Sequence, residues 1–371
     1  MTHPYETLPE DRFWRSAVAD RDALDIAGLW KPKLRINRKD RIVTAGSCFA
    51  QHFARALVAR GYRWTDFEPG PSGLTPALKH DYHYGTFSFR TGNIYTPRML
   101  RQWLTWALTP TPTPEEVWEQ DGRFYDPFRP GVEPGGFASA AELQASRLDT
   151  LAAIRRGLKE ARVFVFTLGL TESWRDRETR AEYAVCPGTI AGTFDAERHE
   201  FVNHGYDALL ADMKSVLKLM WRVNRKLNIL LTVSPVPLTA TASDQHVLTA
   251  TVHSKSLLRA VASTLVQGQA RVDYFPSYEI ITHPAYHGQF YAPNLRSVLP
   301  EGVDHVMKTF FQDQAARFEA IPAAPPTAEP PDINLQTAAG DDPDPPEMSE
   351  AEELRCEEEI LAAFAPDVRN G

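Results

Sequence analysis

The stretch IVTAGSCFAQHFARALVARGY, residues 42–62, decides the fold class. It opens with β-branched apolar residues and then enters a small-residue turn at Gly46. Beyond the turn, apolar residues recur at helical spacing, at Phe49, Phe53 and Leu57. Gly61 is placed to end that helix. The stretch therefore predicts a strand, a tight turn and a helix, which is the unit of doubly wound α/β sheets.

The same alternation recurs three more times along the chain. Helical patterns are followed by apolar strands, as 141–160 with 163–167, 206–226 with 228–233, and 254–266 with 271–275. The strands are near-continuous apolar runs, which is typical of a parallel sheet covered on both faces. A final helix is expected to open at Pro300, since proline is favoured at the first helical position.

Composition divides the chain into an N-terminal extension that wraps the domain (1–40), an α/β domain (41–320), a Pro- and Asp-rich segment that we expect to be disordered (321–348), and a short acidic helix and tail (349–371). The capping box Ser349-x-x-Glu352 opens the last helix, which carries Leu354, Leu361 and Phe364. This helix could dock on a partner protein or on its own domain, and a solvated tail is the alternative.

Charge and cysteine usage exclude several classes of protein. The net charge is −8, but much of the acidic excess lies near the C-terminus, so the body has no nucleic-acid footprint. Three widely spaced cysteines give neither a disulfide framework nor a zinc signature. The N-terminus lacks the apolar core of a secretory signal, and no stretch approaches the roughly 20 apolar residues of a membrane helix. We expect a cytoplasmic protein with no metal, no cofactor and no membrane partner.

Four segments follow the predicted strands, namely Thr44–Cys48, Leu168–Trp174, Ser234–Thr241 and the loop from His283 to the last helix. In a doubly wound sheet, ligands and catalytic groups collect just beyond the carboxyl ends of the strands. Ser47 sits where a strand turns into a helix, so its hydroxyl could attack a carbonyl while its own N–H stabilises the oxyanion. An ordinary helix cap is the alternative for this serine.

Six blocks of the sequence resemble one family. They are Gly46–Ala50, which reads GSCFA, and 85–96, 167–174, 232–237, 254–256 and 274–279. In this order, over roughly residues 40–310, they are similar to the GSCFA family, which is grouped with the SGNH/GDSL-like hydrolases. The resemblance implies a three-layer α/β/α sandwich with a parallel, flavodoxin-like sheet. It also implies ester or acyl-transfer chemistry with Ser47 as the nucleophile.

The predicted oxyanion site departs from the SGNH pattern. SGNH enzymes carry Gly-x-Asn after a central strand, and here Thr171 replaces the asparagine after Gly169. A hydroxyl has a shorter reach than an amide, and losing a good oxyanion donor costs about 3 kcal/mol. Asn93 could supply the missing amide, or it could stabilise its own turn. The N–H groups of Ser47 and Gly169 complete the predicted set. Arg90 could bind a substrate carboxylate or phosphate, with a surface ion pair as the alternative.

The proton acceptor is harder to assign. SGNH enzymes use a late Asp-x-x-His, which this chain lacks, and where part of the GSCFA family shows His-Pro it reads Leu299-Pro300. His305 is the predicted substitute, with Glu301 one helical turn back to orient its imidazole. Other candidates are His283 and His287, in a loop at the correct end of the sheet, and His83.

Four more residues have predicted places near the site. Ser234 ends a strong strand and, with His283 and His287, is expected to line the substrate pocket. Cys48 could itself be the nucleophile, since helix N-termini lower thiol pKa values, or it could be a small buried apolar residue. His52 is expected to face away from Ser47 into solvent. Lys255 is expected on a helix surface, where it could hold an anionic substrate.

The sequence thus predicts a serine esterase or O-acyltransferase that acts through an acyl-Ser47 intermediate on an O-acyl ester. Glycan esters are candidate substrates by analogy with acyl-modifying relatives alone. The alternative is a catalytically degenerate SGNH-fold protein that binds a partner through its acidic C-terminal helix. The discriminating feature is a histidine nitrogen within hydrogen-bond reach of Ser47 Oγ.

Overall fold

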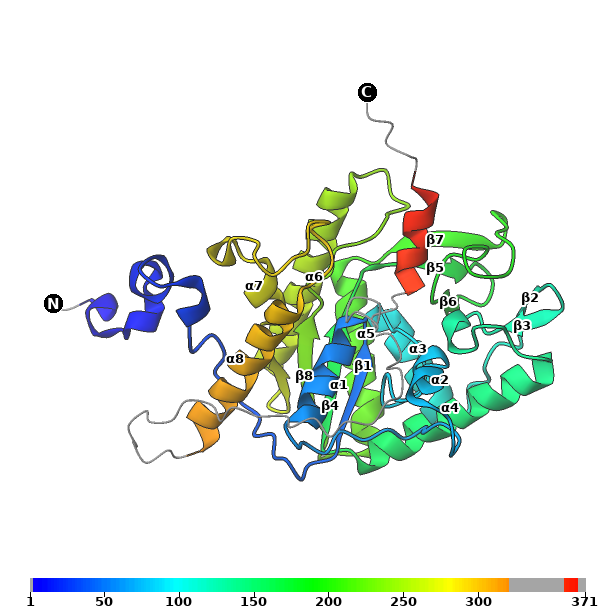
Figure 1. Ribbon diagram of the computed structural model, residues 1–371, viewed down its shortest axis with the longest axis horizontal. Coiled ribbons are helices and arrows are strands. Elements are labelled where there is room, and N and C mark those ends of the chain that lie inside the picture. The colour runs from blue at the N-terminus through cyan, green and yellow to red at the C-terminus, as the bar shows by residue number, and fades with distance from the viewer. Residues whose placement is uncertain (1–2, 320–356, 366–371) are drawn as a thin grey trace, which may run out of the picture.

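The structure is a computed structural model that describes residues 3–319 and 357–365. Its centre is a parallel sheet (Figure 1) with the strand order β1-β4-β8-β9. The strands are β1 (Ile42–Gly46), β4 (Val163–Leu168), β8 (Asn228–Val233) and β9 (Val272–Tyr274). Every residue in them is buried, as expected for apolar runs covered on both faces. The predicted α/β fold class is confirmed.

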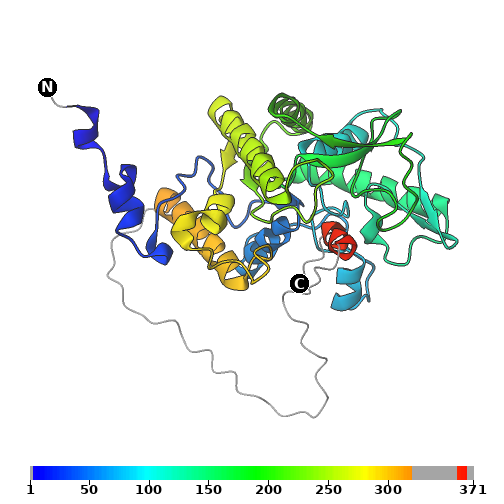
Figure 2. The ribbon, with the colours of Figure 1, turned by 90° about the horizontal axis from the view of Figure 1, so that it is seen from above.

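Helices cover both faces of this sheet and make three layers (Figure 2). Side chains of β4 alternate between two cores, because successive residues of a strand point to opposite faces. Val163 and Val165 join the core with α1 (Phe49–Ala59), α7 (Ser277–Thr282) and α8 (Pro300–Phe318). Phe164 and Phe166 join the core with α3 (Pro97–Leu108), α4 (Ala140–Glu160), α5 (Tyr206–Val223) and α6 (Val247–Gly268).

The helix bounds agree with the sequence patterns except for α6. The pattern predicted a helix over 254–266, and the observed helix begins seven residues earlier, at Val247. His246 caps it, because the side chain of His246 accepts a hydrogen bond from the N–H of Leu248. The earlier start adds two exposed apolar residues, Leu248 and Val252, which do not fit an amphipathic pattern.

A second, antiparallel sheet stands at the carboxyl end of β4. It consists of β5 (Glu172–Asp176), β6 (Glu182–Tyr183) and β7 (His199–Asn203) in the order β6-β5-β7. The sequence did not predict this sheet, since its strands are short, and β5 and β7 mix buried with half-buried residues. It adds a wall beside the strand ends where ligands are expected.

Residues 26–36 attach the N-terminal extension to the domain. The ring of Trp30 stacks on Phe310 at 5.2 Å, and the backbone N–H of Trp30 donates to the Asp313 carboxylate at 3.0 Å. The N–H of Ile36 donates to Gln314 at 3.2 Å. The short elements are η1 (Pro4–Thr7), η2 (Glu10–Arg12), η3 (Arg15–Ala19), η4 (Ala23–Asp25), α2 (Pro76–Asp81), β2 (Trp118–Gln120), β3 (Arg123–Tyr125), η5 (Pro130–Val132) and η6 (Pro284–Tyr286).

The C-terminal residues that the structure describes form the 3₁₀ helix η7 (Glu357–Phe364), which lies beside the antiparallel sheet and α3 (Figure 1). The predicted disordered segment 321–348, the capping box at Ser349 and Leu354 lie outside the described residues. Within the described ranges, no helix is both long and apolar enough to cross a membrane.

Candidate active site

The turn that carries Ser47 is fixed by close packing between β1 and β4. Gly46 has φ +137°, and a Cβ on it would lie 2.5 Å from the carbonyl oxygen of Thr167. Only glycine fits this position, so the chain turns directly from β1 toward α1. Ser47 follows at 3 % exposure, and its Oγ has no hydrogen-bond partner. The serine is thus held rigidly at the carboxyl edge of the sheet, as predicted, and it is buried.

Asn93 lies on a segment that runs along β1. The N–H of Ile94 donates to the carbonyl oxygen of Gly46 at 2.8 Å, which places Asn93 next to the turn of Ser47. Asn93 is 1 % exposed, and neither its Oδ1 nor its Nδ2 has a hydrogen-bond partner. The alternative in which this side chain stabilises its own turn is therefore not what the structure shows.

Gly169 forms the other side of the Ser47 turn. A Cβ on Gly169 would lie 3.2 Å from Ser47 Cβ and 3.1 Å from the carbonyl oxygen of Tyr95. The N–H groups of Gly169 and Leu170 both donate to that same oxygen, at 3.0 and 2.9 Å. Three segments, after β1, before α3 and after β4, therefore meet around Ser47.

Three predicted oxyanion donors are already engaged in hydrogen bonds. The N–H of Ser47 donates to Thr167 at 3.2 Å, and the N–H of Gly169 donates to Tyr95. The Thr171 hydroxyl donates to Asn203 Oδ1 at 2.8 Å. These bonds would have to break before any of the three groups could donate to an oxyanion. Asn93 is the member of the predicted set whose side-chain donor has no partner in the structure.

Helix α6 contributes two buried residues that hold this loop. The ammonium group of Lys255 donates to the carbonyl oxygen of Gly169 at 2.7 Å, and Ser254 Oγ accepts from the N–H of Thr171 at 3.1 Å. Lys255 is 1 % exposed, so its predicted place on a helix surface is wrong. The signal that could have found it is the Ser-Lys-Ser block itself, since a lysine between two serines interrupts the apolar face of α6.

His305 does not reach Ser47. Its Nε2 is buried without a hydrogen-bond partner, as is Ser47 Oγ, so the two do not bond to each other. The ring stacks on Phe290 at 5.3 Å and meets Tyr286 edge-on at 5.7 Å. Burial lowers its pKa, and the nearby Lys308 lowers it further. Glu301 is exposed, and His305 Nε2 forms no hydrogen bond with any described residue, so the predicted carboxylate–imidazole pair does not form.

The other predicted histidines are also not bonded to Ser47 Oγ. His283 caps η6 by accepting from the N–H of Ala285 at 3.1 Å, and its ring lies 5.6 Å from that of Trp14. His287 is exposed, with φ +55°. His83 also has a positive φ, +58°. The structure therefore brings no imidazole of the described residues into hydrogen-bond contact with the serine.

Arg90 and Ser234 have structural partners. The guanidinium of Arg90 is 4 % exposed, donates to the carbonyl oxygen of Tyr82 at 2.7 Å and forms an ion pair with Glu133 at 3.0 Å. It is neither a surface ion pair nor free to bind substrate. Ser234 is 1 % exposed, and its Oγ accepts from the N–H of Val236 at 3.3 Å. Ser234 shapes the loop after β8 and lines neither of the two cavities beside the Ser47 turn.

A cavity of about 670 Å³, here called the α1–α8 cavity, adjoins the turn of Ser47. Its walls include Cys48 and His52 from the start of α1 and Leu299, Pro300 and Val303 from the start of α8. His52 was expected in solvent, but it is half-buried, and burial lowers its pKa to about 4. Cys48 is disulfide-bonded, which removes its thiol as a nucleophile. The sequence did not indicate this bond.

A second cavity, of about 640 Å³, adjoins the turn from the opposite side. We call it the β5–β7 cavity, because Glu172, Trp174 and Phe201 of the antiparallel sheet line it. Tyr95 and Leu170, which flank Gly169, also line it. Ser47 therefore lies between two cavities, one on each side of the carboxyl edge of the sheet.

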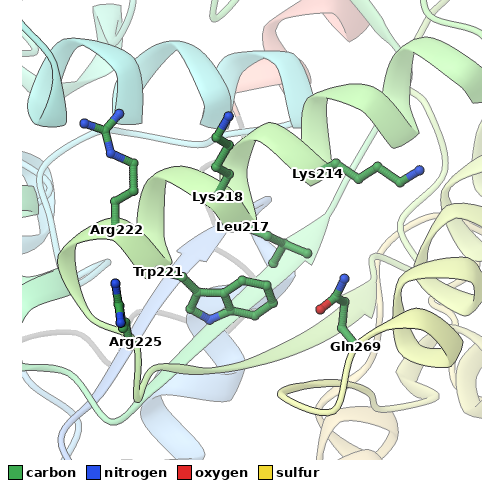
Figure 3. A pocket seen from close by; sticks show the side chains of 7 residues that line it. All are labelled: Lys214, Leu217, Lys218, Trp221, Arg222, Arg225 and Gln269. Atoms are coloured by element: carbon green, nitrogen blue, oxygen red, sulfur yellow. The ribbon is translucent and has the colours of Figure 1, made fainter.

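A third hollow, of about 580 Å³, lies on the outer side of α5 (Figure 3). Its walls carry the cations Lys214, Lys218, Arg222 and Arg225 around Trp221. In Figure 3 the cationic side chains on α5 fan outward instead of converging. Because the end of α5 leads into the start of β8, this hollow lies at the amino ends of the strands, away from Ser47.

The fold and the site define an α/β protein with a buried serine at the carboxyl edge of a parallel sheet. The model of the GSCFA family matches residues 41–310, and the chain belongs to this family. No curated protein and no solved structure matches the chain. Among the described residues, no group of three or more histidine, cysteine, aspartate or glutamate side chains is placed to hold a metal ion.

Proposed function

We propose that the chain is a serine esterase or O-acyltransferase that acts through an acyl-Ser47 intermediate on an O-acyl ester, with glycan esters among the candidates. The observation that carries this proposal is the pair of buried, unpartnered groups at the sheet edge, Ser47 Oγ and the Asn93 amide. Leaving such a group without a partner costs about 1–3 kcal/mol. A bound ester could place its carbonyl carbon against the hydroxyl oxygen for attack, while its carbonyl oxygen accepts a hydrogen bond from the amide.

In the acylation step, Ser47 Oγ forms a bond to the carbonyl carbon, and the bond from that carbon to the alkoxy group breaks. The serine proton ends on the departing oxygen, which leaves as an alcohol. Asn93 Nδ2 donates to the negative oxygen of the tetrahedral intermediate. Attack on the acyl-serine by water gives hydrolysis, and attack by a second alcohol gives transfer.

The missing imidazole favours a second candidate, a binding or scaffold protein built on the same fold. Ser47 Oγ bonds to no base among the described residues, and a serine without a base is a weak nucleophile. Under this alternative the unpartnered groups would bind a ligand without reacting, and the acidic C-terminal segment would recruit a protein partner.

The test compares the full-length protein with Ser47→Ala. We expect the wild type to hydrolyse p-nitrophenyl acetate at least about 10²-fold faster than the variant, which lacks the nucleophile. A fluorophosphonate should add its mass to the wild type and leave Ser47→Ala unlabelled. The control is Ser256→Ala, a change at an exposed serine on α6, which should keep the wild-type rate. Equal rates for the wild type and Ser47→Ala would end the catalytic proposal in favour of the scaffold.

A further inference from the structure

The β5–β7 cavity has the lining of an apolar binding pocket. Apart from Glu172, its walls are uncharged side chains, many of them apolar or aromatic, including Met99, Trp174, Val185, Phe201, Leu238 and Val247. Its volume of about 640 Å³ lies in the range of small-molecule sites. The cavity reaches the turn of Ser47 through Tyr95 and Leu170, whose backbones are joined by a 2.9 Å hydrogen bond beside Gly169.

The single carboxylate in this lining is already satisfied. Glu172 accepts from the Thr241 hydroxyl at 2.9 Å and from the Asn203 amide at 3.3 Å. Burial raises its pKa, and the Thr241 hydrogen bond partly opposes that rise. The pocket therefore offers an anionic ligand no cation within its described lining, and it favours an uncharged apolar group.

The C-terminal segment, η7, closes one side of this pocket. Leu361 and Phe364 line the cavity, yet Phe364 remains 64 % exposed, so the segment covers the mouth without filling the interior. At the other end of η7, Glu359 lines the α1–α8 cavity and forms an ion pair with Arg296 at 3.3 Å. One short segment thus lies across both cavities that flank Ser47.

We propose that the β5–β7 cavity binds the apolar acyl chain of the ester substrate, and that η7 competes with this chain for the mouth of the pocket. The proposal rests on the proposed function of Ser47 and names its substrate class. The substrate is an ester with a medium-length aliphatic acyl group, because the lining is apolar. In the closed state Leu361 and Phe364 cover the mouth through which that group would enter. A substrate that needs an open mouth binds more weakly by the fraction of molecules that are open.

The kinetic test uses the full-length protein with the double change Leu361→Ser and Phe364→Ser. Its matched control is Ala363→Ser, an exposed residue of the same 3₁₀ helix. We expect kcat/KM for p-nitrophenyl octanoate to rise about tenfold in the double variant, because the competing side chains are gone. The rate with p-nitrophenyl acetate should change less than about twofold, since a short acyl group does not enter the pocket. An equal change for both esters, or no change for octanoate, would overturn the proposal.

A binding measurement separates this proposal from the fate of the catalytic one. In the Ser47→Ala background, the neutral fluorescent probe N-phenyl-1-naphthylamine reports on an apolar pocket without any reaction. We expect the double change at Leu361 and Phe364 to tighten probe binding by about tenfold, and Ala363→Ser to leave it unchanged. Tighter binding without ester turnover in the wild-type background would keep the pocket and refute the function. Unchanged probe binding would refute the pocket, whatever the turnover.

Discussion

The two sides of Ser47 differ in the polar groups that they place near the serine. On the nucleophile side, comprising Gly46, Asn93 and Gly169, three segments converge, and an unpartnered amide lies beside the serine. On the base side, comprising the α1–α8 cavity and the start of α8, the wall carries Leu299, and no imidazole of the described residues bonds to Ser47 Oγ. The comparison shows that the carboxyl edge of the sheet holds a buried serine and an unpartnered amide together, while no imidazole of the described residues bonds to that serine.

Replacing Asn93 with alanine should have the largest effect of the single changes beyond the nucleophile itself. If Asn93 is the working oxyanion donor, Asn93→Ala should lower kcat for p-nitrophenyl acetate by about 10²–10³-fold with little change in KM. Steady-state kinetics of the purified variant measure this split. The matched control is Thr171→Ser, which keeps the hydroxyl that bonds to Asn203.

The opposite result would assign the role of oxyanion donor to Thr171 instead of Asn93. If Asn93→Ala were as active as the wild type and Thr171→Val, which lacks the hydroxyl, were not, the hydroxyl of Thr171 would have to leave Asn203 and donate to the substrate. The nucleophile side would then be assembled only on binding, and its convergence in this structure would not be the catalytic arrangement.

Installing an imidazole on the base side should produce the next largest effect. Leu299 lines the same cavity as Cys48, so Leu299→His places a proton acceptor at the wall next to the Ser47 turn. General-base catalysis contributes about 10²–10⁴-fold, and we expect a rise near the lower end of that range. The gain should disappear as the pH falls below about 6.5, because a protonated imidazole accepts no proton.

The control for this gain is a change at the histidine that the sequence favoured. His305→Leu should leave the rate unchanged, because its ring is packed between Phe290 and Tyr286. A rate–pH profile of both variants decides the point. Loss of activity in His305→Leu, together with no gain in Leu299→His, would return the role of base to His305 and imply a rearranged α8.

The sequence was sufficient for the parts of the molecule that depend on local pattern. Apolar runs gave all four parallel strands, and glycine at position 46 marked the turn, because a Cβ there would strike β4. The antiparallel sheet was missed, since β6 has only two residues and β5 mixes polar with apolar side chains. Such strands are defined by their pairing with each other, which no local pattern records.

The residues of the site also divide into those that a local pattern predicts and those that depend on contacts between distant segments. Ser47 could be placed from the strand–turn–helix pattern alone. The sequence could not show whether the Asn93 side chain offers a free amide or stabilises its own turn. The answer depends on how the segment that carries Asn93 pairs with Gly46. Lys255 was misplaced, since its burial depends on the carbonyl oxygen of Gly169, a residue 86 positions away. The position of the His305 ring was likewise not predictable, because the ring packs on Phe290 and Tyr286 from another segment.

The smallest expected effect is the pH dependence of stability that comes from His52, which is half-buried in the α1–α8 cavity. His52 lines the α1–α8 cavity, where burial lowers its pKa from 6.5 to about 4 and Arg55 adds to the shift. Between these values the imidazole of His52 is protonated in the unfolded chain and neutral in the folded protein. The free energy of unfolding therefore falls as the pH drops from 6.5 toward 4. At pH 5 the loss is about 2 kcal/mol.

Urea unfolding at pH 7.5 and pH 5 should therefore show a smaller loss for His52→Leu than for the wild type. The exposed His287, changed to leucine, serves as the control and should leave the loss as it is in the wild type. If His52→Leu lost as much stability as the wild type, the α1–α8 cavity would be wet enough to accept a charged imidazole.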